Sequence, residues 1–246
     1  MRNHTSLALR SLLVTVLLPA LAVGAAPEPS LRLDLAQGGT ALPIQIVIIL
    51  TLLSFIPAIL ISMTCFTRLI VVFYFLRQAL GTTEAPNNQV LLGLALFLTM
   101  FVMGPVFARV HTDALAPLMA GEITHAEALP RAMVPLRAYM LKHTRERDLA
   151  LFIRLSGSPR PRTPDDVPTT ALVPAYMISE LKTAFQIGFV LFIPFLIIDM
   201  AVSSVLLSMG MMQLPPVIIS MPLKVLLFVM VDGWYLIVGS LVKSVM

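Results

Sequence analysis

The chain has 246 residues, of which 58% are apolar and only 12% are charged. Soluble domains have roughly 45 to 50% apolar and about 25% charged residues, so this composition indicates a membrane protein and excludes a soluble enzyme, a disordered tail and a fibre. The single cysteine, Cys65, cannot close an intrachain disulfide. The net charge of +4 is not gathered into the dense basic face that phosphate contacts require. We therefore expect membrane lipid and other apolar helices as partners, and no nucleic acid.

The first 25 residues have the pattern of a secretory signal peptide. Arg2 and Arg10 make the leader basic, and residues 12–23 form an apolar core that is too short to span a bilayer comfortably. Small residues follow, so we expect cleavage after Gly24 or Ala25, with an uncleaved anchor as the alternative. The first two predicted segments of the chain are therefore a signal peptide, 1–25, and an N-terminal spacer, 26–42.

Four apolar blocks follow the spacer. They lie at about residues 43–76, 89–108, 184–212 and 217–242. The first block would reach about 50 Å as one helix and contains Pro57 and Arg68, so it is expected to be a kinked helix or two pieces. Turn-forming residues join the blocks in pairs, at residues 77–89 and around Gly210 and Pro215. The expected fold class is all-α and membrane-associated, with two long kinked helical hairpins, 43–108 and 184–246, and an inserted extracytoplasmic helical region.

That inserted region, residues 109–183, carries ten of the 17 Lys and Arg residues and eight of the 13 acids. Thr124 and Glu127 have capping-box spacing, and Leu129, Met133, Leu136 and Met140 recur on one helical stripe. The charge run 142–148 is interpreted as a solvated face, and the proline-rich stretch 156–174 as a flexible loop. A cleaved leader places the region outside the cytoplasm, because loops longer than about 60 residues translocate largely regardless of charge.

The sequence carries no recognisable catalytic motif. It has no glycine-rich phosphate loop, no nucleophile elbow, no zinc-protease HExxH motif and no cysteine pair, and its four histidines lack metal-ligand spacing. We expect no enzyme, no cofactor and no metal.

Charged residues inside the apolar blocks are the first candidate functional feature. Asp199 and Lys224 lie at similar distances from the turn near residue 213, so they are expected to neutralise each other. A structural ion pair is the favoured interpretation, and a gate or relay charge is the alternative. Lys224 and Asp232 would each cost about 2.5 to 3.5 kcal/mol at a bilayer centre, so burial of this block inside an assembly is as plausible as a lipid-facing span.

The second candidate feature is a methionine cluster at the turn of the second hairpin, Met209, Met211 and Met212. Methionine at helical spacing is normally core filler. A turn between two apolar helices is an unusual place for core, however, and flexible thioethers from a ring of identical turns would form a soft plug. Beside the cluster, Ser204 and Ser208 have spacing that permits close helix approach, next to Gly210.

These segments together resemble the FliP family of flagellar export proteins. The resemblance is carried by the runs 66–81, 88–97, 135–152, 194–204, 209–216 and 223–234. It implies a core pore-forming subunit of the flagellar type III export gate, in the inner membrane at the flagellar basal body. In that family several copies, described as a pentamer, join FliQ and FliR, with FlhA and FlhB at the entrance, and unfolded flagellar subunits pass through the bore.

The resemblance also assigns roles to residues. Met209, Met211 and Met212 correspond by position to the family's methionine gasket, and Gln213 stands where the family usually has a further Met. Arg68, Asp199, Lys224 and Asp232 are candidate buried or assembly charges. Two other functions stay open: the homologous virulence injectisome subunit, and a small ion or proton channel built on the charges of the second hairpin.

Overall fold

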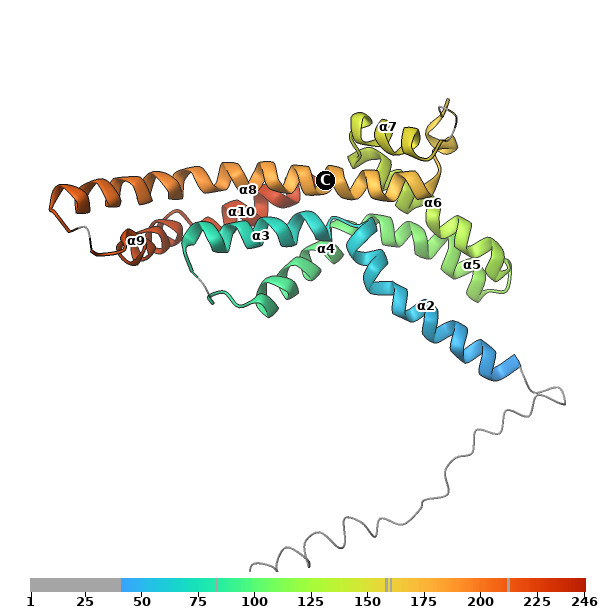
Figure 1. Ribbon diagram of the computed structural model, residues 1–246. Helices are drawn as coiled ribbons and strands as arrows, with labels where there is room; N and C mark the ends of the chain where they lie inside the picture. The colour runs from blue at the N-terminus through green and yellow to red at the C-terminus, as the bar shows by residue number, and fades with distance from the viewer. Residues whose placement is uncertain (1–40, 83, 158, 160, 212) are drawn as a thin grey trace, which may run out of the picture. The chain divides into compact units, whose positions relative to one another are not determined.

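The computed structural model describes residues 41–246 except residues 83, 158, 160 and 212. The expected signal peptide, and the spacer except for its last two residues, lie outside this range. The described residues form helices, turns and loops, which confirms the all-α prediction (Figure 1). In chain order the elements are α2 (Ala41–Met63), α3 (Phe66–Leu80), α4 (Asn88–Val110), the π-helix η1 (His111–Leu115), α5 (Ala116–Met119), α6 (His125–His143), α7 (Glu146–Leu155), the 3-10 turn η2 (Pro164–Asp166), α8 (Thr169–Ser208), α9 (Pro216–Met230) and α10 (Gly233–Val245).

The chain divides into two units, and the boundary between them falls after residue 53, within the sequence of α2. The described part of the first unit, residues 41–53, is the first half of α2 and exposes the apolar side chains of Ile46, Val47 and Leu50. The second unit, residues 54–246, holds all the remaining elements. The core and the candidate sites described below belong to this second unit.

The predicted break in the first apolar block exists, but it is not at Pro57. The helix continues through Pro57 to Met63, and the segment Pro57–Met63 makes an angle of 79° with α3. The break falls at Thr64, whose hydroxyl donates to the carbonyl of Leu60 and accepts the Phe66 N–H at 3.3 Å. A side-chain hydroxyl that competes for backbone partners in this way interrupts the helical ladder, which a search for proline does not detect.

The second hairpin differs from its prediction at both ends. Its first helix, α8, has 40 residues and spans about 60 Å, and it begins at Thr169 instead of residue 184. The loop predicted for residues 156–174 is therefore wrong over its last part, because burial of Leu172, Ala175 and Tyr176 holds that stretch in a helix despite its prolines. The last apolar block is also not one helix: α9 and α10 meet at Asp232 with a bend of 67°.

Helix α3 is the centre of the core. It packs mainly along α8 and α4, and it buries Leu69, Val72, Phe73 and Leu76. The approach of α3 to α8 is close at Gly188, where a Cβ would lie 2.5 Å from the ring of Phe75. Glycine is therefore required there by contact between two helices.

The inserted region is helical and docks against α8. The Thr124 N–H donates to Glu127 Oε2 at 2.9 Å, which confirms the capping box at the start of α6. The predicted apolar stripe is only partly right, because Met140 is buried whereas Leu129 is 69% exposed. The charge run is also not wholly solvated. Asp148 is buried and accepts a hydrogen bond from Ser179 Oγ at 2.8 Å, so α7 is attached to α8 through it.

Candidate functional site

An ion pair at the centre of the second unit joins three helices. Arg68 of α3 donates through Nε to Glu180 Oε2 at 2.7 Å and through Nη2 to Glu180 Oε1 at 2.5 Å. Its Nη1 also donates to the carbonyl of Ser244 in α10 at 2.7 Å. Both charged side chains are buried, and a bidentate arrangement satisfies the planar guanidinium well. The pair ties α3, α8 and α10 together. Sequence reasoning selected Arg68 but missed Glu180, because Glu180 lies in the stretch that was interpreted as aqueous.

Polar side chains surround this pair on the side of the inserted region. Ser179, next to Glu180, accepts the backbone N–H of Arg145 at 3.0 Å and donates to Asp148. The ring of Tyr139 in α6 packs edge to face on Tyr176, with centroids 6.2 Å apart. Burial raises the pKa of Tyr139 far above its ordinary value, and the nearby Cys65 and Glu180 raise it further, so this phenol stays protonated. The surroundings are those of a rigid structural core.

A second ion pair crosses the second hairpin. Lys224 Nζ of α9 lies 2.6 Å from Asp199 Oδ2 of α8. This confirms the pairing that was predicted because the two residues lie at similar distances along the chain from the turn near residue 213. Ser220 Oγ, one turn before Lys224, donates to the other carboxylate oxygen at 2.6 Å. The side chain of Lys224 is 5% exposed and that of Asp199 is 30% exposed. Both charges are thus neutralised within the hairpin.

Asp232 is placed differently from the other candidate charges. It is exposed, has φ 52°, and lies at the break between α9 and α10. Among the described residues Asp232 takes part in neither of the two ion pairs. Lys224 is paired with Asp199. The burial expected for Asp232 is therefore not found in the part of the chain that the structure describes.

The methionine turn lies at the far end of the second hairpin and is exposed. Met209 is 66% and Met211 is 38% exposed, and Gln213 is exposed beside them, while Met212 lies outside the described residues. Gly210 has φ 71°. Its N–H donates to the carbonyl of Leu207, and the N–H of Met211 donates to the carbonyl of Leu206, so these two bonds end α8. This left-handed position favours glycine. Because its described side chains face away from the core of this chain, the turn does not act as core filler within it.

The small residues before the turn also have no packing role inside the second unit. Ser204 and Ser208 are exposed, and Ser208 Oγ donates to the carbonyl of Val205 in its own helix at 2.7 Å. The close helix contact in this chain is made at Gly188 instead. Ala184 and Gly188 have the same four-residue spacing as Ser204 and Ser208, so the sequence did carry a signal for this contact, and the prediction selected the wrong pair.

Large apolar side chains cover the outside of both hairpins. Exposed examples are Phe97, Phe101, Phe189, Ile197, Ile218, Val229 and Tyr235. Among the described residues, two stretches are long and apolar enough to cross a membrane, Asn88–Met119 and Thr169–Ser208. The number rises to four if Pro57–Met63 with α3, and α9 with α10, each form one bent span. A surface of this kind must be covered by lipid or by other apolar chains.

The match to known proteins extends over the elements that hold the ion pairs and the turn. The FliP family matches residues 49–241. The chain belongs to the FliP family. It is 57% identical over 201 residues to the flagellar biosynthetic protein FliP of Bacillus subtilis, a match that covers 82% of this chain and 91% of the relative.

Two further relatives show how far the likeness extends. The flagellar biosynthetic protein FliP of Pectobacterium carotovorum is 54% identical over 212 residues, which cover 85% of this chain and 82% of the relative. That of Caulobacter vibrioides is 45% identical over 244 residues, which cover 99% of this chain and 91% of the relative. Most of the chain, including both hairpins and the inserted region, is thus shared with these proteins.

Proposed function

We propose that this protein is a core pore-forming subunit of the flagellar type III protein export gate and passes unfolded flagellar subunits across the inner membrane. The observation that carries the proposal is the exposed methionine turn, Met209 and Met211 with Gln213, at the end of the long α8–α9 hairpin. Soft apolar side chains with no packing role in their own chain can close against symmetry mates and part again. Membership of a family whose relatives are named flagellar biosynthetic proteins supports the flagellar setting.

The proposed assembly contains several copies of this chain, five in the family arrangement, together with FliQ and FliR. FlhA and FlhB would meet it at the entrance. The exposed apolar faces of α4, α8 and α9 support an assembly, because the described residues of a single chain do not cover them. The proposed setting is the inner membrane at the flagellar basal body, with the signal peptide cleaved and the inserted region outside the cytoplasm.

The two alternative functions fit the observations less well. An ion or proton channel would use Asp199, Lys224 and Asp232, yet the first two neutralise each other and Asp232 is separate from them. A fixed, hydrogen-bonded pair has the features of a structural link. The injectisome alternative predicts relatives named for virulence secretion, whereas the three relatives described above are flagellar proteins.

The gasket is tested by replacing Met209, Met211 and Met212 together with Ala in cells that carry the rest of the gate. Assembly should be normal, because the described side chains of this turn contact no core. The inner membrane should become permeable to small ions, measured as dissipation of a membrane potential dye. A matched control replaces Met119, which is 84% exposed and far from the turn in sequence, with Ala and should leave the membrane sealed.

Two outcomes would contradict the gasket. A triple variant that assembles and keeps the membrane sealed removes the gasket role from the turn. A triple variant that fails to accumulate supports core filler, because each buried Met→Ala would cost about 2 to 5 kcal/mol. Gln213→Met is a companion test, since an apolar side chain that faces the bore should reduce any resting leak.

A further inference from the structure

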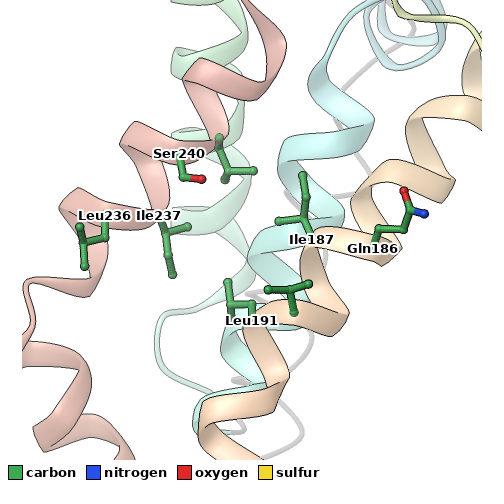
Figure 2. A pocket seen from close by; sticks show the side chains of 8 residues that line it. Gln186, Ile187, Leu191, Leu236, Ile237 and Ser240 are labelled. Carbon is green, nitrogen blue, oxygen red and sulfur yellow. The ribbon is translucent and has the colours of Figure 1, made fainter.

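An apolar groove with a volume of about 420 Å³ runs between α8 and α10 (Figure 2). Ile187 and Leu191 line it from α8, and Leu236 and Ile237 line it from α10. The described residues leave this groove open, although the side chains that line an empty space between two apolar helices lose van der Waals contacts. An apolar ligand would restore those contacts.

The groove has a polar end and an apolar end. Arg68 binds both Glu180 of α8 and Ser244 of α10, so these two residues mark one end of the helix pair. From there α8 runs forward to Leu191 while α10 runs backward to Leu236, and the helices are antiparallel. The two polar lining residues, Gln186 and Ser240, therefore lie towards the Arg68 end.

Three cations belong to this polar end, one by its hydrogen bonds and two by their positions along the helices. Arg145 Nη2 donates to Gln186 Oε1 at 2.5 Å and to Thr183 Oγ1 at 3.1 Å. Lys182 lies four residues before Gln186, and Lys243 lies three residues after Ser240, so each is on the same helix face one turn nearer that end. Both lysines are exposed.

The acids close to these cations do not neutralise them. Glu180 is buried and paired with Arg68, and Asp148 is buried and bonded to Ser179. Glu146, the exposed acid beside Arg145, leaves the group net positive. Beyond Lys182 the only charged residue of α8 is Asp199, so the cations lie where the polar part of the helix gives way to its apolar part. That position on a membrane helix corresponds to the headgroup level of a bilayer.

We propose that the groove binds one acyl chain of an anionic phospholipid, whose phosphate is held by Arg145, Lys182 and Lys243. A cationic end joined to an apolar slot complements a molecule with a negative head and a hydrocarbon tail. A helix from a second copy fits less well. The exposed apolar helices α4 and α9 carry no acid, so docking either of them would bury the cations without a counter-charge.

The test uses the protein purified in mild detergent with the partners it retains, and native mass spectrometry of the lipids it keeps after delipidation. We expect phosphatidylglycerol to be retained and phosphatidylcholine to be lost. The double variant Lys182→Gln with Lys243→Gln should weaken phosphatidylglycerol binding about 30-fold. Ser240→Phe should fill the groove and remove the lipid. Arg154→Gln and Ala150→Phe, both at exposed positions of α7, are the matched controls for charge and bulk.

The lysine double variant keeps the test decisive if Ser240→Phe does not fold, because both lysines are exposed. Equal retention of the two lipids by the unchanged protein, or unchanged retention by the double variant, would overturn the proposal. A photo-crosslinking amino acid at Leu236 separates the occupants directly. Crosslinks to phospholipid are expected, and crosslinks to a second copy or to another protein would show that a polypeptide covers the groove.

Discussion

The Arg68–Glu180 pair allows a sharp test of what holds the second unit together. Replacing Arg68 with Met leaves the carboxylate of Glu180, which is 0% exposed, without its counter-charge. Breaking a buried pair in this way costs about 3 to 5 kcal/mol. The carbonyl of Ser244 also loses its donor, so we expect a value in the upper part of that range.

The assay is thermal unfolding of the purified protein in detergent. For a chain of this size about 1 kcal/mol shifts Tm by about 2 to 4 °C, so Arg68→Met should lower Tm by on the order of 10 °C. Adding Glu180→Leu should recover most of the loss, because an apolar pair of similar volume avoids the desolvation of both charges. Arg154→Met, at an exposed position, is the control. A single variant within about 1 kcal/mol of the unchanged protein, or a double variant as unstable as the single, would refute this account.

Three further predictions concern α8, α9 and α6. Lys224→Ala should leave Asp199 without its cation, at a cost of about 3 kcal/mol because that carboxylate is partly exposed, and should reduce the yield of assembled complex. Gly188→Ala should cost about 1 to 3 kcal/mol in thermal unfolding, because the added Cβ meets an aromatic ring of α3. The capping bonds lower the pKa of Glu127, so the start of α6 should lose hydrogen-exchange protection as pH falls through its folded pKa.

Each of these predictions has a control or a contrary result. Normal assembly of Lys224→Ala with altered export alone would support a gating charge. Gly104→Ala, where no atom lies within 4 Å of the added Cβ, should be neutral or slightly stabilising. The carboxylate of Glu127 stabilises the helix start fully only above its unfolded pKa, and Glu127→Gln should remove this pH dependence. Persistence of the dependence in that variant would assign it to another group.

The sequence by itself determined the features that depend on neighbours along the chain. The apolar blocks and the residues between them predict helices joined in hairpins, and Gly210 with Pro215 places the turn of the second hairpin. Counting residues from that turn was enough to predict that Asp199 and Lys224 lie near each other, because both helices rise by the same amount per residue. The capping box of α6 was predicted for the same reason, since its partners are three residues apart.

Tertiary structure alone decided the features that depend on distant segments. Arg68 and Glu180 are 112 residues apart, and no spacing rule relates them. The start of α8 at Thr169 is set by burial against the core, which outweighs the loop tendency of the prolines before and within it. The groove between α8 and α10 likewise exists only because the bend at Asp232 turns α10 beside α8. The local sequence pattern determines which segments become helices. The free energy of burial, however, is a sum over residues that come into contact only after folding. It therefore decides where those helices begin, where they break and where a groove remains between them.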